Sequence, residues 1–470
     1  MSSDTVQKRT FSENFIRFFD RWTPNSMVIA YLLTAIVAIL ALVFTDTPFV
    51  TFQAGQSSVI GAWGEGFWAL LDLAMQMSLI LITGSLIATA PPVRKFLQKV
   101  AMRPNNMGQA VLLVMAIVPL INWFHFGLGI MLGIHLGRQI VLAAKVKGYK
   151  LHNPLFVALL YGTGITGIGI SQIAPIFGAS QNALRSLFRH NPEVQAMIPE
   201  VVPLAQSAFL VQNILMCIIV LVVVFGAIWL MRPRKESSII EPSEALIAEI
   251  EAQNKMGMDR PNMTSPAEKI DNSIIPSLII GIFGLIWVVR FFIVSGRLDF
   301  NNFNMVMIII GLLVCGSPNQ FIRGVQSAIG STWGIIIQFP FYAGIFGLIT
   351  YTGLNEVIVT FFMSFATAQN WPFISYVYTS IVNIAVPSGG PKFFIVAPYV
   401  LEVAARLNVD IGTMLVAYVA GDVSTNGFLP FWALPYLALF KLDFKKILPY
   451  TAIGSTAAYV IFTIFFLFIF

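Results

Sequence analysis

The chain has 470 residues, of which 57% are hydrophobic and only 11% are charged, and its formal net charge is +6. A soluble domain covers its surface with about 25% charged residues, so most of this surface must face something other than water. The composition therefore excludes a soluble enzyme, a disordered protein and a coiled coil. The two cysteines, Cys217 and Cys315, lie inside apolar runs, which predicts buried thiols without a disulfide scaffold.

Residues 1–25 precede the first long apolar run. They combine a capping-box pattern, Thr10-Phe-Ser-Glu13, with aromatic residues at helical spacing that are opposed by charged residues. This pattern predicts an N-terminal amphipathic helix lying in the membrane interface. A cytoplasmic helix packed against the core is the alternative interpretation.

A membrane-crossing helix needs about 20 apolar residues. The uninterrupted candidates are residues 26–45, 67–90, 207–231, 273–294, 303–316, 331–352 and 447–470. Residues 154–178 and 411–440 are also long enough, but Gly and polar residues interrupt them, which predicts two broken helices. Residues 109–142 and 373–403 have glycine-rich tips between short apolar runs, which predicts two re-entrant hairpins. We therefore expect an all-α polytopic membrane protein with nine crossings.

Lysine and arginine collect in the short cytoplasmic loops of membrane proteins. With a cytoplasmic N-terminus, the Lys and Arg residues fall on the cytoplasmic side except Arg185, Arg189, Arg290, Arg297, Lys392 and Arg406. This bias explains the basic charge without nucleic acid as a partner. It predicts a multi-pass protein in the lipid bilayer of the bacterial inner membrane, with a periplasmic C-terminus and a polar cytoplasmic linker at 232–272.

The two halves of the chain resemble each other at nearly constant spacing. Gln76 recurs as Gln338, Asn122 recurs as Asn383, and Tyr161-Gly-Thr-Gly164 recurs as Tyr418-Val-Ala-Gly421. We expect a first repeat at 26–231, a connecting transmembrane helix at 273–302 and a second repeat at 303–470. Under the predicted topology 26–45 runs outward and 303–316 runs inward, so the repeats are inverted. Inverted repeats with broken helices are typical of secondary transporters, whose sites lie near the membrane midplane.

The two tips and the two breaks are the candidate functional site, because irregular backbone at membrane depth must be buried in protein or line a wet cavity. Helix N-termini direct N–H groups at anions, whereas helix C-termini and Asn, Ser and Thr oxygens suit cations. The candidate substrate- and ion-binding residues are Asn122, His125, Gly127, Thr163, Gly164, Thr166, Asn383, Ser388, Gly389, Gly390, Lys392, Asp422, Ser424, Thr425 and Asn426. Helix packing through small residues is the alternative role for any single Gly or Ser.

Ionisable residues at this depth indicate function, because burying a charge in a membrane is costly. We expect Lys392 to be a fixed cation near the substrate, and Asp422 to pair with it or take up a proton. The alternative is a purely structural ion pair. His125 lies at the first tip and titrates near neutral pH in water; the alternative is a neutral, hydrogen-bonded histidine inside the tip.

No enzyme chemistry is predicted. The four histidines and two cysteines show no metal-ligand spacing. The run Gly-Thr-Gly-Ile-Thr-Gly lacks the lysine of a phosphate-binding loop, and neither a nucleophile elbow nor paired catalytic carboxylates occur. We therefore expect a non-enzyme that needs no cofactor.

Six motifs carry a family resemblance. They are Trp63-Gly-Glu-Gly-Phe-Trp68, Met75-Gln-Met77, Ile121-Asn-Trp123, Gln338-Phe-Pro-Phe-Tyr-Ala-Gly-Ile345, Asn383-Ile-Ala-Val-Pro-Ser-Gly-Gly390 and Pro430-Phe-Trp-Ala-Leu-Pro435. With them, the chain resembles the short-chain fatty acid transporter family of the ion transporter superfamily across nearly its whole length. The resemblance implies a scaffold domain, a moving transport domain with both hairpins, elevator-type alternating access, coupling to Na⁺ or H⁺, and a homodimer.

Two departures from the family pattern fall on the candidate site. The family continues Pro-Ser-Gly-Gly with Gly-His-Trp, where this chain has Pro391-Lys392-Phe393. A Gly-Glu-Gln-Trp type run precedes Pro-Phe-Trp in the family, where this chain has Asp422-Val-Ser-Thr-Asn426. The departures leave the substrate and the coupling ion open. A sodium site, if sodium is that ion, is expected at Asn122, Thr163 and Thr166.

Residues and resemblance together predict a secondary active transporter of short-chain fatty acids or other small monocarboxylates, such as butyrate or acetoacetate. A transporter or exchanger of dicarboxylates or other organic anions is the nearest alternative, because Lys392 adds a cation. A channel is a more remote alternative, since channels usually have a continuous polar pore.

Overall fold

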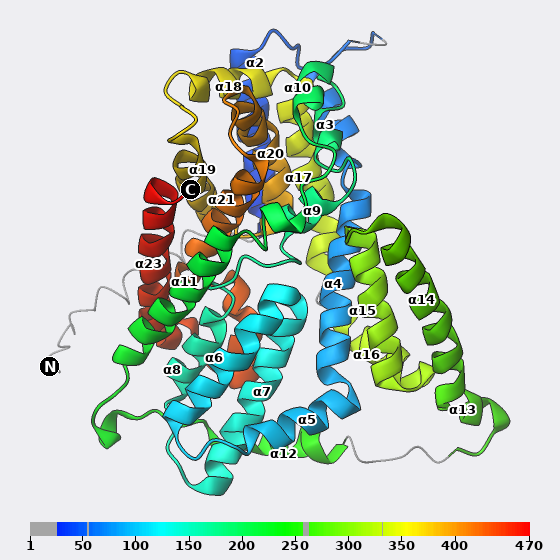
Figure 1. The fold of residues 1–470 in the computed structure, drawn as a ribbon, viewed down its shortest axis with the longest axis vertical. Coiled ribbons are helices and arrows are strands. Elements are labelled where there is room, and N and C mark those ends of the chain that lie inside the picture. Colours follow the sequence, from blue (N-terminus) through cyan, green and yellow to red (C-terminus); the bar gives the residue numbers. More distant parts are fainter. Residues whose placement is uncertain (1–25, 54–55, 257–262, 331) are drawn as a thin grey trace, which may run out of the picture.

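The computed structural model describes residues 26–53, 56–256, 263–330 and 332–470 (Figure 1). The amphipathic helix predicted for 1–25 lies outside these ranges. Within them the chain is helical and has no strand, and eight helices are long and apolar enough to cross a membrane. These are α2 (Ser26–Phe44), α4 (Leu71–Thr89), α6 (Met107–Phe124), α7 (Phe126–Lys147), α11 (Val211–Leu230), α14 (Ile274–Ser295), α17 (Trp333–Tyr351) and α23 (Phe444–Phe468). The all-α membrane fold is thus confirmed.

The first hairpin consists of α6 and α7, which meet at His125. Its arms have 18 and 22 residues, so they are longer than the short helices that the sequence predicts. The chain turns back at His125, and both arms lie in the lower part of the molecule (Figure 1).

The second hairpin consists of α19 (Trp371–Ala385) and α20 (Gly389–Arg406). Its tip contains Pro387, which ends α19 because it cannot donate to a continuing helix. Pro391 lies in the first turn of α20, where the missing N–H leaves no intrahelical bond unmade. This hairpin enters from the upper end, opposite the first (Figure 1), as inverted repeats require.

Both predicted broken helices are present. The first comprises α8 (Asn153–Gly162), an irregular glycine-rich stretch and α9 (Ile173–Ala179). The second comprises α21 (Ile411–Ser424), the short turns η4 (Asn426–Phe428) and η5 (Phe431–Ala433), and α22 (Leu434–Phe440). Pro430 and Pro435 flank η5 and prevent one continuous helix.

The helices that begin each half exchange partners. From the first half, α2 and α3 (Val59–Phe67) pack on α17 of the second half. From the second half, α15 (Phe300–Cys315) and α16 (Pro318–Ile329) pack on α4 of the first half. The α3–α17 contact needs glycine, because a Cβ on Gly66 would lie 2.6 Å from the carbonyl oxygen of Ala343. Likewise α4 contacts α7, and α17 contacts α20. This reciprocal packing is what two interlocked repeats produce.

Two groups of helices result. The hairpins and broken helices pack with α11 and α23, while α2–α4 and α14–α17 pack among themselves. The remaining elements are short and were not predicted. They are α5 (Pro91–Ala101), η1 (Arg185–Phe188), α10 (Pro192–Met197), η2 (Leu204–Gln206), η3 (Glu236–Ser238), α12 (Glu244–Met256), α13 (Pro266–Asp271) and α18 (Leu354–Met363).

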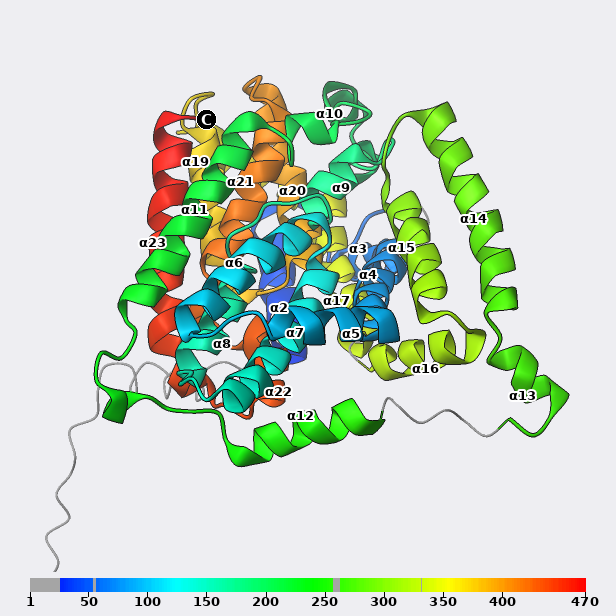
Figure 2. The ribbon, with the colours of Figure 1, turned by 60° about the horizontal axis from the view of Figure 1, so that its bottom comes forward.

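The polar segment 232–272, predicted as a linker, contains the helices α12 and α13. Figure 2 shows α12 extended along one end of the molecule, and it contacts α7. The buried Arg138 of α7 donates hydrogen bonds to Glu249 (2.9 Å) and Gln253 (3.2 Å) of α12 and to the carbonyl of Leu439 in α22 (3.1 Å). The ammonium of Lys441 lies 2.9 Å from Glu249. The linker helix is therefore fastened to the first hairpin and the second broken helix.

Glu249 should make the stability of this attachment depend on pH. Hydrogen bonds from Lys441 and Arg138 hold the pKa of its carboxyl below the ordinary value. Its stabilising contribution is present above that ordinary pKa and is lost as the pH falls through the lowered pKa. We expect Glu249→Gln to lower the thermal midpoint in detergent by roughly a few degrees at neutral pH, and this difference to shrink in acid.

The matched control is Glu251→Gln, because Glu251 is exposed on the same helix. This variant should unfold like the wild type at every pH. Equal midpoints for wild type and Glu249→Gln at neutral pH would show that the network does not hold α12.

Candidate functional site

A cavity of about 900 Å³ lies where the two hairpin tips meet the two helix breaks. Residues from α4 and α17 complete its wall. The predicted site residues that line it are Asn122, Gly127, Gly164, Ser388, Gly389, Gly390, Asp422 and Asn426. The others, His125, Thr163, Thr166, Asn383, Lys392, Ser424 and Thr425, are buried behind this lining. The structure therefore brings the two predicted clusters together at one cavity.

The second tip and the second break are joined around Lys392. This side chain is fully buried, and its Nζ lies 2.6 Å from Oδ1 of Asp422 and donates to Oδ1 of Asn383 at 2.7 Å. The ring of Tyr418 lies 5.6 Å from the same nitrogen. A buried charge needs such partners, because desolvation is otherwise uncompensated.

Asn383 uses both ends of its amide. Its Nδ2 donates to Oγ1 of Thr425 (2.9 Å) and to Oδ1 of Asn426 (2.8 Å), while its oxygen accepts from Lys392. The neighbouring Ser424 hydroxyl lies 3.1 Å from that of Ser380 in α19. The second hairpin thus holds the second break by a continuous polar network.

The first half repeats the central contact. Nδ2 of Asn122 donates to Oγ1 of Thr163 at 2.9 Å, the same atoms and distance that join Asn383 to Thr425. The structure therefore aligns Thr163 with Thr425. This corrects the register inferred from Tyr161–Gly164 and Tyr418–Gly421, because the hydrogen bond to the hairpin asparagine sets the alignment of the breaks rather than the shared Tyr and Gly.

The two halves differ in charge. Lys392 is four residues after Ser388, which precedes α20, and Gly129 is four residues after His125, which precedes α7. A Cβ on Gly129 would lie 2.0 Å from Oδ1 of Asn122, so that amide packs directly on the helix backbone. Among the described residues this Oδ1 has no hydrogen-bond partner, whereas the equivalent oxygen of Asn383 binds an ammonium.

His125 is a helix cap. Its ring is buried, and its Nδ1 accepts the N–H of Leu128 at 3.1 Å, while the N–H of Phe126 donates to the hydroxyl of Ser171 at 2.8 Å. A ring nitrogen that accepts a hydrogen bond carries no proton. The geometry therefore fits the neutral, hydrogen-bonded interpretation.

The oxygens expected to bind sodium come from the first hairpin, which contains Asn122, and from the first break, which contains Thr163 and Thr166. The Thr163 hydroxyl donates to the carbonyl of Leu160 (2.7 Å), and that of Thr166 donates to the carbonyl of Thr163 (3.1 Å). The Thr166 hydroxyl oxygen keeps lone pairs for a cation, and Oδ1 of Asn122 is buried and unpaired within the described part of the chain. Oxygen ligands of this kind suit a hard cation such as Na⁺. The sodium site stays a prediction.

The cavity offers anion donors at the second tip. The N–H groups of Gly389 and Gly390 begin α20, so they have no intrahelical acceptor, and both residues line the cavity. The Asp422 carboxylate packs closely on this glycine, because a Cβ on Gly389 would lie 2.7 Å from its Oδ2. In α7, by contrast, His125 and Ser171 already accept the first N–H groups.

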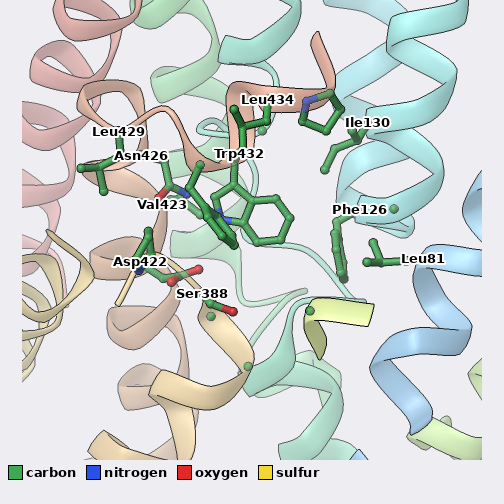
Figure 3. Close-up of a pocket in the computed structure, with 18 of the residues that line it drawn as sticks. Leu81, Phe126, Ile130, Ser388, Asp422, Val423, Asn426, Leu429, Trp432 and Leu434 are labelled. Carbon is green, nitrogen blue, oxygen red and sulfur yellow. The ribbon is translucent and has the colours of Figure 1, made fainter. Parts of the chain in front are cut away.

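Sequence reasoning missed the apolar wall. Figure 3 shows Trp432 projecting into the cavity between Ser388 and Asp422 on one side and Phe126 with Leu81 on the other. The polar lining residues Ser85, Gln172 and Gln338 were also not predicted as site residues. Gln338 carried a signal, since it is the repeat partner of Gln76, but apolar side chains within apolar helices carry none.

The two breaks also touch directly. The hydroxyl of Tyr161 in α8 donates to the carbonyl of Asn426 at 2.8 Å. This bond joins the first broken helix directly to the second.

Comparisons with known proteins agree with this architecture. A family model described as "Short chain fatty acid transporter" matches residues 8–469. A protein of Escherichia coli K12, provisionally named a short-chain fatty acid transporter, is 32% identical over 95% of this chain and 97% of its own length. A relative from Haemophilus influenzae with the same provisional name is 32% identical over 96% of this chain and 98% of its own length.

Among solved structures, the crystal structure of the Alcanivorax borkumensis YdaH transporter has a similar fold. Its TM-score is 0.56 at 14% identity, and the match covers 94% of this chain and 98% of that one. That structure is described as having an unusual topology. At this identity the likeness shows the fold alone.

The two hairpin asparagines should differ in their contribution to stability. Asn383→Ala removes three hydrogen bonds and leaves the Lys392 ammonium with one partner fewer, whereas Asn122→Ala removes one hydrogen bond. We expect the free energy of unfolding to fall by about 1 kcal/mol in Asn122→Ala and by at least about twice that in Asn383→Ala. Thermal unfolding of both purified variants in detergent measures the difference, and equal losses would contradict the asymmetry.

Proposed function

Because the chain belongs to the short-chain fatty acid transporter family, we propose that it carries short-chain fatty acids or other small monocarboxylates, such as butyrate and acetoacetate, by secondary active transport. The observation that supports this most is the composition of the cavity. It combines the N–H groups of Gly389 and Gly390, which have no acceptor within α20, with an apolar wall that includes Trp432 and Phe126. A short acid has the same two parts, a carboxylate and an alkyl chain.

In this proposal the carboxylate binds at the N-terminus of α20, where N–H groups and the helix dipole favour an anion. The Ser388 hydroxyl, which makes no capping hydrogen bond to α20, is a further donor. The alkyl chain packs against Trp432, which projects into the cavity, and against Phe126 and Leu81, which lie on the side away from Ser388 (Figure 3). Burial of each CH₂ group contributes about 0.8 kcal/mol.

The alternating step is an elevator-type movement. The hairpins and broken helices form one packed group with α11 and α23, and α2–α4 with α14–α17 form another. The cavity is lined from both groups, since α4 contributes Met77 and α17 contributes Phe339. We propose that the first group moves along the second at the α4–α7 and α17–α20 contacts.

Candidate residues for coupling are present for both Na⁺ and H⁺. Asn122, Thr163 and Thr166 supply oxygens for Na⁺, and Asp422 is a carboxyl that reaches the cavity and can take up a proton.

The end of the molecule that carries α5 and α12 faces the cytoplasm in this proposal, and the protein lies in the inner membrane. The reason is that α5 and the end of α7 are rich in Lys and Arg. A homodimer is expected from the superfamily resemblance.

The dicarboxylate alternative depends on Lys392 as a cation for a second carboxylate. The ammonium is fully buried and already bound to Asp422 and Asn383, so this cation is occupied. The geometry therefore favours a monocarboxylate.

Uptake of labelled butyrate into proteoliposomes tests the function. We expect accumulation driven by an imposed Na⁺ gradient or by an imposed proton gradient, and the gradient that drives it identifies the coupling ion. Protein-free liposomes are an essential control, because neutral butyric acid crosses bilayers without a carrier. No uptake above this control under either gradient, together with exchange of another organic anion, would contradict the proposal.

Trp432→Ala should weaken binding of short acids, because it removes the largest apolar contact with the alkyl chain. We expect the KM for butyrate to rise roughly tenfold, and hexanoate to compete better with butyrate than it does in the wild type. Trp68→Ala is the matched control, since Trp68 is exposed and lies outside the cavity. An unchanged KM in Trp432→Ala would place the alkyl chain elsewhere.

A further inference from the structure

Asp422 lies beside the proposed carboxylate site. Its side chain lines the cavity and is 10% exposed, and its Oδ2 would lie 2.7 Å from a Cβ on Gly389. A substrate carboxylate at the Gly389 and Gly390 N–H groups would therefore meet a second carboxylate. Two like charges at this range repel strongly where water is scarce, so the tip binds an anion only if Asp422 is neutralised.

Lys392 is placed to do this. Its Nζ is 2.6 Å from Asp422 and 2.7 Å from Asn383, and the ring of Tyr418 covers it at 5.6 Å. Tyr418 also donates its hydroxyl to the carbonyl of Gly389 at 2.6 Å, which connects this cage to the tip. A second ion pair on α20, between Glu402 and Arg406, lies at the far end of the helix, and Glu402 also accepts a hydrogen bond from Asn355. These charges therefore do not compete with Lys392 for Asp422.

The charges occur as a pair in one half only. The Asn–Thr hydrogen bonds align Thr163 with Thr425. Three residues before Thr163 stands Leu160, where Asp422 stands three residues before Thr425. Gly129 stands where Lys392 stands relative to the start of the hairpin's second helix. The first half thus lacks both the carboxylate and the ammonium, while it keeps the asparagine and threonine. A lysine that served packing alone would not need to occur together with this aspartate.

The geometry points to Lys392 as a tethered counter-ion of Asp422, which keeps the anion-binding tip electrically neutral; without its side chain, the same oxygens form a site for a free small monovalent cation, such as ammonium. This inference rests on the proposed function for its role in transport, and on the cage geometry alone for cation binding. Ammonium has the same charge and nitrogen donors as the lysine head group, so it fits the positions of Asp422 and Asn383.

The test compares Lys392→Ala with the wild type in butyrate counterflow, with equal salt on both sides so that no ion gradient contributes. In a choline buffer that contains the same low Na⁺ concentration on both sides, so that a Na⁺-coupled carrier can still turn over, we expect exchange in Lys392→Ala to fall at least about tenfold, because a buried carboxylate has lost its partner. Ammonium or methylammonium should restore it several-fold, whereas the wild type should not respond. Lys150→Ala, which removes an exposed lysine paired with an exposed Glu236, should behave like the wild type.

A double variant separates charge from shape. Lys392→Ala with Asp422→Asn has no unpaired carboxylate, so we expect it to exchange butyrate faster than Lys392→Ala in choline and to gain nothing from ammonium. If Lys392 has only a packing role, the double variant should be at least as impaired as the single one, and ammonium should help neither.

Thermal unfolding in detergent gives a readout that is independent of transport. Ammonium should raise the thermal midpoint of Lys392→Ala in a saturable way and leave the double variant unchanged. If Lys392→Ala does not fold, Lys392→Met keeps the apolar stem and takes its place. No ammonium response in either exchange or unfolding would overturn the inference. An ammonium-dependent midpoint together with a wild type that does not exchange butyrate would retain the cation cage and overturn the proposed function instead.

Discussion

The constraint on which this structure depends is that backbone polar groups at membrane depth have no water to bind. The chain can leave helical geometry there only where other protein groups or a cavity satisfy the freed N–H and C=O groups. The two tips and the two breaks meet this requirement by facing one another. Asn122 and Asn383 each reach from a tip to a threonine of a break, and Tyr161 joins the breaks. The cavity is the space that remains at this meeting point.

Repetition of the constraint in both halves explains the symmetry, and its relaxation in one half explains the asymmetry. The hairpin asparagine and the threonine it binds are common to both halves, because they hold the irregular backbone in place. Lys392 and Asp422 have no counterpart, since Gly129 and Leu160 occupy the equivalent positions. The shared contacts therefore hold the irregular backbone in both halves, whereas the charged pair occurs at the second tip and break alone among these equivalent positions. A pair buried this deeply is stable only because Asn383 and Tyr418 complete its surroundings.

The candidate site was partly accessible from the sequence. Clusters of glycine and proline interrupt helices and charge is costly at membrane depth, so these residues identified both tips, both breaks and the Lys392–Asp422 pair. The apolar wall was not accessible, because Trp432, Phe126 and Leu81 do not differ in kind from the apolar residues around them. The role of His125 as a cap also needed coordinates, since it depends on the angle at which α6 meets α7. The spacing of Tyr161 and Tyr418 predicts an alignment of the breaks that differs by five residues from the one that the asparagine hydrogen bonds to Thr163 and Thr425 set.

By itself the sequence determined that this chain is a helical membrane protein with two helical hairpins and two broken helices. Hydropathy and helix-breaking residues act over short stretches of chain, so local patterns are enough to predict these elements. Only the tertiary structure decided that α2 and α3 pack on α17 while α15 and α16 pack on α4, that Lys392 binds Asn383 as well as Asp422, and that α12 is fastened to Arg138. These contacts join segments far apart in the chain. Their partners are selected by shape and by the need to satisfy buried polar groups, and no local pattern records that selection.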